Sequence, residues 1–174
     1  MNREQSVDAR GVGRWMMIIS WVLLLALLSY LFNGALEHQN NPNSSPETST
    51  NASGASEVVL VRNRAGHYVA NGRINGHEVL FLLDTGATDV ALSRELAEKL
   101  ELPRGAQMIS QTANGAVISW QTQLSEVSLG DITLSNVSAS VLPSISGNEV
   151  LLGMSFLKRL ELVQRGGRLT LRKL

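Results

Sequence analysis

The sequence has no cysteine, and this absence removes several classes of chemistry at once. Without thiols there are no disulfide frameworks, thiolate nucleophiles, Cys-ligated zinc sites or iron–sulfur clusters. Charge is scarce, at 17% of residues, and balanced, with 15 Lys and Arg against 15 Asp and Glu. A neutral chain has no excess of cations to neutralise a phosphate backbone, so nucleic acid is not an expected partner. The chemistry must therefore come from oxygen or imidazole groups.

Imidazole groups are also few, and their spacing does not favour a metal site. The three histidines, His38, His67 and His77, form no helical i, i+4 pair and no HExxH motif. A serine nucleophile is equally poorly supported, because residues 153–157 (GMSFL) lack the closing glycine of a G-x-S-x-G elbow. We expect neither a metal nor a cofactor, and carboxylates remain as the candidate reactive groups.

One long hydrophobic run stands out, at residues 15–36, where no side chain is charged. As a helix it would extend roughly 33 Å, enough to cross a hydrocarbon core, and Trp15 and Tyr30 lie near its ends. A cleaved secretory signal and a buried core helix are the alternatives. Asn33 fits the small-residue cleavage pattern before Ala35 poorly. We therefore expect an uncleaved transmembrane signal anchor.

The basic residues around this run predict its orientation. Arg3, Arg10 and Arg14 precede it, whereas Arg62 is the next Lys or Arg after it. By the positive-inside rule, residues 1–14 form a cytoplasmic tail. The rest of the chain is then expected in the periplasm or another extracytoplasmic space, with the protein held in the inner membrane by a single pass.

Residues 37–56 (EHQNNPNSSPETSTNASGAS) contain no large apolar side chain. Such a segment cannot bury enough surface to offset the entropy lost on ordering, so we predict a flexible linker with an end-to-end distance of roughly 25 Å.

Residues 57–174 are long enough for one domain, and short apolar runs separated by Gly and Asn predict that it is mainly β. Strands at 67–74 and 77–83 should form a hairpin through Asn75-Gly76, a dipeptide suited to a type I′ turn. Ser93 is a candidate N-cap of one short helix. A second hairpin is predicted over 107–123, turning at 114–115. Further strands are expected at 124–129, 132–134, 137–142, 150–152 and on both sides of 165–167.

The candidate reactive group is Asp84, which ends the strongly apolar run of residues 79–83 and is followed at once by Thr85 and Gly86. A carboxylate next to so much apolar surface is unfavourable unless something compensates, because burial disfavours its charged form. A functional acid is one interpretation. The alternative is a turn aspartate whose side chain binds its own backbone.

Three segments, in order, resemble the retropepsin-like aspartic proteases. Residues 81–93 (FLLDTGATDVALS) resemble the family's active-site segment, with the pattern hydrophobic-hydrophobic-D-[ST]-G-[AS]. Residues 112–117 (TANGAV) resemble its flap tip. Residues 150–157 (VLLGMSFL) resemble the strand and short helix behind the catalytic loop. The N-terminal anchor further resembles a membrane-bound bacterial branch of the family.

The resemblance implies an all-β domain at 57–174, a closed barrel or sandwich with one or two short helices, preceded by one transmembrane helix. It implies that Asp84 is the catalytic acid, and that Thr85 and Gly86 support its loop. The residues it places at the substrate are Gly86, Ala87, Thr88, Asp89, Asn114 and Gly115. It implies a polypeptide as the substrate.

Peptide hydrolysis by this route needs two carboxylates that share one proton, and the chain has a single D-T-G. We therefore expect a homodimer in which Asp84 of each copy meets at a two-fold axis. Two alternatives remain: a tethered β domain that binds extended peptides without cleaving them, and a structural envelope protein.

Two features depart from the retroviral pattern or leave a choice open. That pattern commonly has an acid where Thr88 stands and an arginine where Met154 stands, and here both are missing together, so no unpaired buried charge is left. Residues 168–174 (RLTLRKL) alternate as a strand. By the resemblance this strand would interleave with a second copy, whereas from the sequence alone it could equally complete its own sheet.

Overall fold

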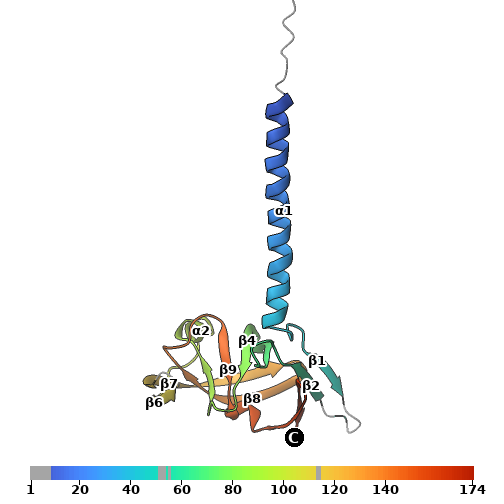
Figure 1. Ribbon diagram of the computed structural model, residues 1–174. Helices are drawn as coiled ribbons and strands as arrows, with labels where there is room; N and C mark the ends of the chain where they lie inside the picture. The colour runs from blue at the N-terminus through green and yellow to red at the C-terminus, as the bar shows by residue number, and fades with distance from the viewer. Residues whose placement is uncertain (1–8, 51–53, 55, 113–114) are drawn as a thin grey trace, which may run out of the picture. The chain divides into compact units, whose positions relative to one another are not determined.

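A computed structural model describes residues 9–50, 54, 56–112 and 115–174, with the side chains of 9–12, 33 and 35 left undescribed. The chain divides between Glu37 and His38 into two compact units, here called the helical unit and the folded unit. Figure 1 shows the elements of each.

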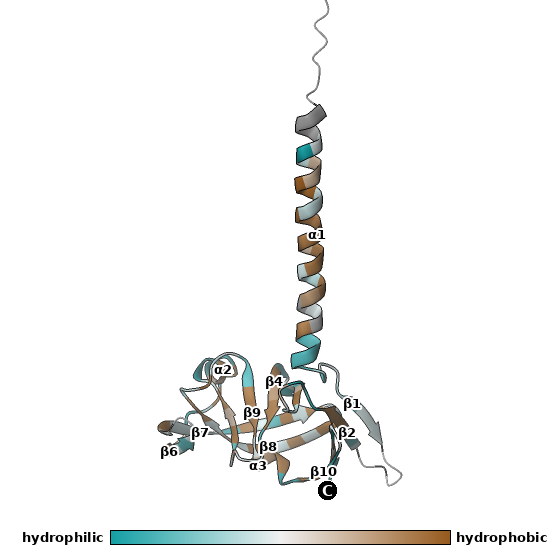
Figure 2. Ribbon diagram, viewed as in Figure 1, coloured by the Kyte–Doolittle hydropathy of each residue, from teal (hydrophilic) through white to brown (hydrophobic). Residues whose placement is uncertain are grey.

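The described residues of the helical unit belong to one long helix, α1 (Ala9–Asn40), which contains the predicted span and whose last three residues lie past the boundary at Glu37. Its hydrophobic side chains are exposed, among them Trp15, Leu23 and Phe32, and Figure 2 shows the hydrophobic colouring along most of its length. Residues Gly13–Asn40 are long and apolar enough to cross a membrane, as an anchor or as a signal sequence.

In its described residues, the folded unit is mostly β and has two short helices, as predicted. Its elements are β1 (Glu47–Thr50), β2 (Ser56–Val61), β3 (Val69–Ile74), β4 (His77–Leu83), β5 (Val90–Leu92), α2 (Arg94–Lys99), β6 (Gln107–Thr112), β7 (Gly115–Leu129), β8 (Ile132–Val141), β9 (Glu149–Leu152), α3 (Met154–Leu157), β10 (Leu160–Arg165) and β11 (Arg168–Lys173).

Two sheets form this unit. The larger has the order β3-β4-β9-β5-β8-β7-β6, and an additional pairing of β3 with β7 closes six of these strands into a barrel, with β6 attached outside it. The smaller has the order β1-β2-β11-β10. One core of buried apolar side chains serves both sheets, and it includes Phe81, Phe156, Leu60 and Leu171. The predicted closed barrel is therefore confirmed.

Local signals in the sequence are confirmed where the chain turns. Asn75 and Gly76 have φ angles of 49° and 82°, the left-handed conformation that a type I′ hairpin requires. The Ser93 hydroxyl accepts a hydrogen bond from the backbone N–H of Leu96 at 3.1 Å, which is the expected N-cap.

The predicted flexible linker is wrong over most of its length. α1 continues to Asn40, and β1 pairs with β2 from Glu47 to Thr50. Between them Asn43 is only 3% exposed, because its amide group satisfies three backbone groups. Its Nδ2 donates to the carbonyls of Val61 (2.9 Å) and Val69 (2.6 Å), and its Oδ1 accepts from the N–H of Val61 (2.6 Å). Strand pairing and the burial of a hydrogen-bonded polar side chain require no apolar residue, so composition does not predict either of them.

Asn43 yields a stability prediction. We expect Asn43→Asp to lower the free energy of unfolding by about 2–4 kcal/mol, because the new oxygen turns a donor to two carbonyls into an acceptor that faces them. Thermal or urea unfolding of the full chain measures the loss. Asn136→Asp, at an exposed position, is the matched control and should change stability little. An equally stable Asn43→Asp protein would contradict the buried contact.

The C-terminal strand β11 completes its own sheet. It pairs with β2 on one side and with β10 on the other, so the second of the two alternatives holds in this chain. Arg172 joins the three strands: its Nε donates to Glu57 at 2.7 Å and its Nη1 to Glu161 at 3.4 Å. The hydrogen bond with Glu57 is the main cause that raises the pKa of Arg172 above its ordinary value, and the negative charge of Glu57 comes next. Burial opposes the increase, and the contacts with Glu161 add the least to it.

Candidate active site

The candidate reactive group, Asp84, lies just after β4 in the loop of residues 84–89. β4 runs parallel to β9, and the pairing of Leu83 with Leu152 ends beside the loop. The backbone N–H of Asp84 donates to the carbonyl of Leu152 at 3.2 Å, and the Asp84 carbonyl accepts from the N–H of Ala87 at 3.2 Å. The barrel wall therefore fixes the start of the loop through Leu152, and the hydrogen bond between Asp84 and Ala87 closes a tight turn directly after it.

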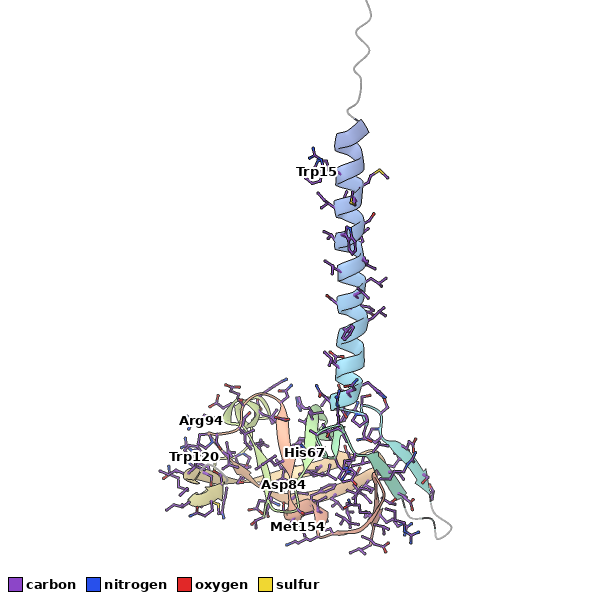
Figure 3. The ribbon with its side chains drawn as sticks, in the orientation of Figure 1. Trp15, His67, Asp84, Arg94, Trp120 and Met154 are labelled. Atoms are coloured by element: carbon purple, nitrogen blue, oxygen red, sulfur yellow. The ribbon has the colours of Figure 1, made fainter. Side chains whose placement is uncertain are left out.

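Asp84, labelled in Figure 3, is a half-buried residue, and its carboxylate is held by the loop itself. Its Oδ1 accepts a hydrogen bond from the N–H of Gly86 at 2.8 Å. A Cβ at position 86 would lie 3.1 Å from the same oxygen, which is closer than an ordinary contact. Glycine at this position therefore avoids a steric conflict with the carboxylate. Among the residues that the structure describes, Asp84 belongs to no group of three acids and histidines that could hold a metal ion.

The short helix α3 supports the loop from behind. The N–H of Met154 donates to the Ala87 carbonyl at 2.8 Å, and the N–H of Ser155 donates to the Thr88 carbonyl at 2.9 Å. Gly153 is equally constrained, because a Cβ there would overlap the carbonyl of Asp89 and lie 2.7 Å from that of Ala87. Backbone hydrogen bonds thus join the segment that contains Thr88 to the segment that contains Met154, the two positions at which the resembled family commonly has an ion pair.

Ser155 is a supporting residue that the sequence did not reveal. Its hydroxyl donates to the carbonyl of Ser138 at 2.7 Å and accepts from the N–H of Val90 at 3.0 Å, so it joins α3, β5 and β8 behind the loop. Ser155 and Val90 are 65 residues apart in the chain. One sequence carries no signal for such a contact, and the only pattern around Ser155 is a poor match to a nucleophile elbow.

The predicted site residues fall into two groups. Thr85, Gly86 and Thr88 are exposed, and Ala87 and Asp89 are half-buried, so one loop carries these five together with Asp84. Gly115 begins β7 with a φ of 106°, which favours glycine. Asn114 lies outside the described residues. The roles assigned to these residues stay predictions.

The β6–β7 hairpin extends from the barrel at the position predicted for a flap. Gln107 to Thr112 pair with Gly115 to Trp120, whereas β7 pairs with β8 only from Trp120 onward. The cross-strand neighbours Ile109 and Ile118 are 72% and 58% exposed, which is unusual for large apolar side chains in this unit. The hairpin therefore presents apolar surface to solvent.

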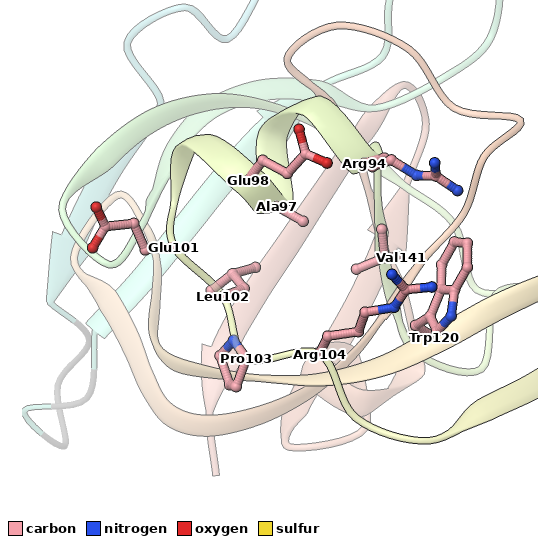
Figure 4. A pocket seen from close by; sticks show the side chains of 9 residues that line it. All are labelled: Arg94, Ala97, Glu98, Glu101, Leu102, Pro103, Arg104, Trp120 and Val141. Carbon is pink, nitrogen blue, oxygen red and sulfur yellow. The ribbon is translucent and has the colours of Figure 1, made fainter.

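Two cavities flank the base of this hairpin. One, of about 340 Å³, is lined by Asp89 of the loop, Arg104, Gln121 and Ser138 among others. The other, of about 160 Å³, is shown in Figure 4 and contains the Trp120 ring. The guanidinium carbons of Arg104 and Arg94 lie 4.1 and 4.8 Å from the centre of that ring, within the range of cation–π attraction. These contacts join the hairpin base to α2 and to the loop before β6.

Sequence comparisons find a family and two relatives. The family model described as gag-polyprotein putative aspartyl protease matches residues 70–159, just over half of the chain. An uncharacterized protein from the cobV 5′ region of Sinorhizobium sp. is 39% identical over 118 residues, covering 66% of this chain and 51% of the relative. An uncharacterized protein of Rickettsia prowazekii (strain Madrid E) is 32% identical over 107 residues, covering 59% and 45%. The chain thus spans about half the length of these relatives.

A comparison of folds agrees. The crystal structure of a retropepsin-like aspartic protease from Rickettsia conorii matches with a TM-score of 0.55 and 29% sequence identity, covering 73% of this chain and 95% of that one. The matched family segment contains both the Asp84 loop and α3.

Proposed function

This chain is a member of the retropepsin-like aspartic protease family, and from that premise we propose that it is an aspartic endopeptidase. The observation that carries the proposal is Asp84, a half-buried residue at the end of a barrel strand whose carboxylate accepts a hydrogen bond from the N–H of Gly86 at 2.8 Å. The Rickettsia conorii protein, a retropepsin-like aspartic protease with 29% identity, supports the same class of reaction.

The chemistry requires two carboxylates, and one copy of the chain supplies one D-T-G. In a homodimer, two Asp84 side chains at a two-fold axis share one proton. The ionised carboxylate takes a proton from a water molecule while the oxygen of that water attacks the peptide carbonyl carbon. The protonated carboxyl group gives its proton to the carbonyl oxygen. As the C–N bond of the resulting gem-diol breaks, the carboxyl group that took the water proton gives it to the departing amine. The other carboxylate takes a proton from a gem-diol hydroxyl, so a carboxylic acid product forms and the pair again holds one proton. No metal is needed for this sequence.

The substrate is an extended polypeptide. The exposed Thr85, Gly86 and Thr88 offer a loop along which a peptide backbone can lie, and the β6–β7 hairpin offers a second surface to close over it. The cavity beside Asp89, at about 340 Å³, has room for a substrate side chain and has polar groups in its wall. Asp89 and Gly115 are therefore proposed as substrate contacts, together with Ala87 and Asn114.

We also propose that α1 anchors the enzyme in the inner membrane, with the folded unit in the periplasm or an equivalent space. The support is the uncharged apolar run of residues 15–36, which lies within the candidate span Gly13–Asn40, together with Arg3, Arg10 and Arg14 before that run. Fixing copies to one plane raises the concentration of partners and so favours the dimer.

The full chain, purified in detergent micelles, tests the activity. We expect it to cleave an unfolded protein or an unbiased peptide mixture, and we expect a statine-type transition-state mimic to block cleavage, because its hydroxyl occupies the place of the attacked carbonyl. A chelator should leave the rate unchanged. New termini are measured by mass spectrometry. If the protein binds peptides but produces no new termini over a range of acid and neutral pH, the proposal is wrong.

A further inference from the structure

The loop between β2 and β3, residues 62–68 and here called the basic loop, is fixed to the segment that follows the predicted span. The buried amide of Asn43 binds backbone groups of the two residues that flank the loop. Within the loop, the Nδ2 of Asn63 donates to the carbonyl of Asn40 at 3.0 Å. Asn40 is the last residue of α1 and belongs to the folded unit. The basic loop is therefore held where the chain enters the folded unit.

The length of the chain keeps this place close to the end of the predicted span. The uncharged apolar run ends at Leu36, and Asn40 follows four residues later. Four residues reach at most about 14 Å when fully extended and rise about 6 Å as a helix. This limit holds for any angle between the helical unit and the folded unit. Since the headgroup layer on each side of a bilayer is roughly 5–8 Å thick, an anchored chain holds the basic loop beside lipid headgroups.

Two arginines give the basic loop its charge. Arg62 and Arg64 are exposed, and the loop sequence RNRAGHY contains no acid. Neither arginine forms an ion pair with any Asp or Glu that the structure describes. The contact that Arg64 makes is with a neutral group, the Oε1 of Gln39 at 3.4 Å. The positive charge of both guanidinium groups is therefore uncompensated within the described part of the chain.

The turn between β10 and β11 adds two arginines to the same surface. It lies beside the basic loop, because the N–H of Arg62 donates to the carbonyl of Gly167 at 2.8 Å. Arg165 and Arg168, on either side of this turn, are exposed. Arg168 contacts Glu47 at 3.4 Å, whereas Arg165 has no ion-pair partner among the described residues. The surface thus carries a clear excess of positive charge.

The basic loop is a fixed turn with a small tip. The N–H of Gly66 donates to the Asn63 carbonyl at 3.0 Å, and the N–H of His67 donates to the Asn63 Oδ1 at 2.9 Å. Ala65 and Gly66 at the tip are exposed and have little or no side chain. A flat surface can therefore approach the backbone of the loop, and little ordering of the loop is needed when it binds.

We infer that the basic loop docks on the headgroups of anionic phospholipids, with Arg62 and Arg64 binding lipid phosphates. Guanidinium groups form paired hydrogen bonds with phosphate, and a cluster of arginines close to a membrane span attracts anionic lipid. The inference rests on the proposed membrane anchoring and is independent of peptidase activity. An acidic protein would suit the same charges, but the length of the chain brings lipid to this surface.

A fluorophore at the loop tip measures docking in the full chain. Because the sequence has no cysteine, Ala65→Cys provides a single labelling site. The protein is placed in nanodiscs with a quencher on the lipid headgroups, made either of phosphatidylcholine alone or of phosphatidylcholine and phosphatidylglycerol in equal parts. We expect strong quenching with phosphatidylglycerol and its loss at high salt, because salt screens exposed charges. Gln111→Cys, exposed on β6, which Figure 1 shows apart from β2, is the reference label and should be quenched less.

Charge variants identify the residues that dock. Arg62→Gln combined with Arg64→Gln should lower the ratio of docked to undocked protein about 25-fold, since each basic side chain near an anionic surface contributes about fivefold. Arg62→Lys combined with Arg64→Lys should dock nearly as well as the wild type, because lysine keeps the charge. Lys99→Gln combined with Lys158→Gln is the matched control, since both lysines are exposed and the net charge changes equally. Melting curves show that each variant is folded.

The outcomes separate this inference from the proposed function. Quenching that does not depend on lipid charge, or equal effects of the two glutamine pairs, would overturn the inference. Protein that elutes apart from the nanodiscs would overturn the anchoring and the inference together. Docking by a protein that never cleaves peptide would support the inference and overturn the proposed peptidase, whereas cleavage without docking would overturn the inference and leave the peptidase standing.

Discussion

Replacement of Asp84 by asparagine is expected to lower the rate of peptide cleavage by at least about 10³-fold, since acid–base groups of this kind contribute up to roughly 10²–10⁴-fold each and both members of the pair are lost together. Asparagine has nearly the same shape, and its Oδ1 can still accept from the N–H of Gly86, so the loop should keep its structure. What it lacks is the ability to take or give a proton. Initial rates on a peptide found by the cleavage test measure the loss.

Asp131→Asn is the matched control, because Asp131 is an exposed acid in the turn between β7 and β8. It should cleave as the wild type does. Mixing wild-type and Asp84→Asn chains adds a test of sharing: activity should fall as the square of the wild-type fraction, since a mixed dimer has one carboxylate. A linear fall would contradict the shared pair, and undiminished cleavage by the variant would remove Asp84 from the reaction.

Gly153→Ala is the second change with a large expected effect. The added Cβ would overlap the carbonyl of Asp89 and lie 2.7 Å from that of Ala87. Because both are backbone atoms of the Asp84 loop, the strain can be relieved only by moving the loop or α3. We expect the free energy of unfolding to fall by about 1–3 kcal/mol, the usual cost of overpacking, and cleavage to fall further than stability does. Urea unfolding and initial rates measure the two effects.

Gly167→Ala provides the comparison for this change. A Cβ at Gly167 meets no atom within 4 Å, and its backbone conformation is open to any residue. Stability should stay the same or rise slightly, because alanine reduces the freedom of the unfolded chain. If Gly153→Ala behaved like Gly167→Ala, the close packing between α3 and the loop would be wrong.

The parts of the fold that sequence predicted are those governed by neighbouring residues. Asn75-Gly76 suits a type I′ turn wherever it occurs, and Ser93 reaches the N–H of Leu96 within one helical turn. β4 was recognised from its unbroken apolar run, and the structure places it between β3 and β9. The Asp84 loop was predicted in the same way, because its motif is contiguous.

The parts that sequence missed depend on partners far along the chain. Asn43 is buried because backbone groups of Val61 and Val69 receive its amide, and β1 forms because β2 offers an edge. Neither requires an apolar side chain, so the polar composition of residues 37–56 predicts a flexible linker and gives no sign of either contact. Ser155 gives no sign of its contacts with Val90 and Ser138 for the same reason. The position of β11 could not be predicted either, because it depends on pairing with β2, which lies far away in the sequence, as well as with β10.

The continuity of β7 bears on how the β6–β7 hairpin can move. β7 is one strand of 15 residues: its first part pairs only with β6, whereas from Trp120 onward β8 holds it in the barrel wall. The hairpin is thus fixed at one end only. There the guanidinium groups of Arg94 and Arg104 lie over the Trp120 ring and add to the pairing with β8. Because the strand is continuous, we expect it to bend along its length, with a displacement that is smallest at Trp120 and larger toward Gly115.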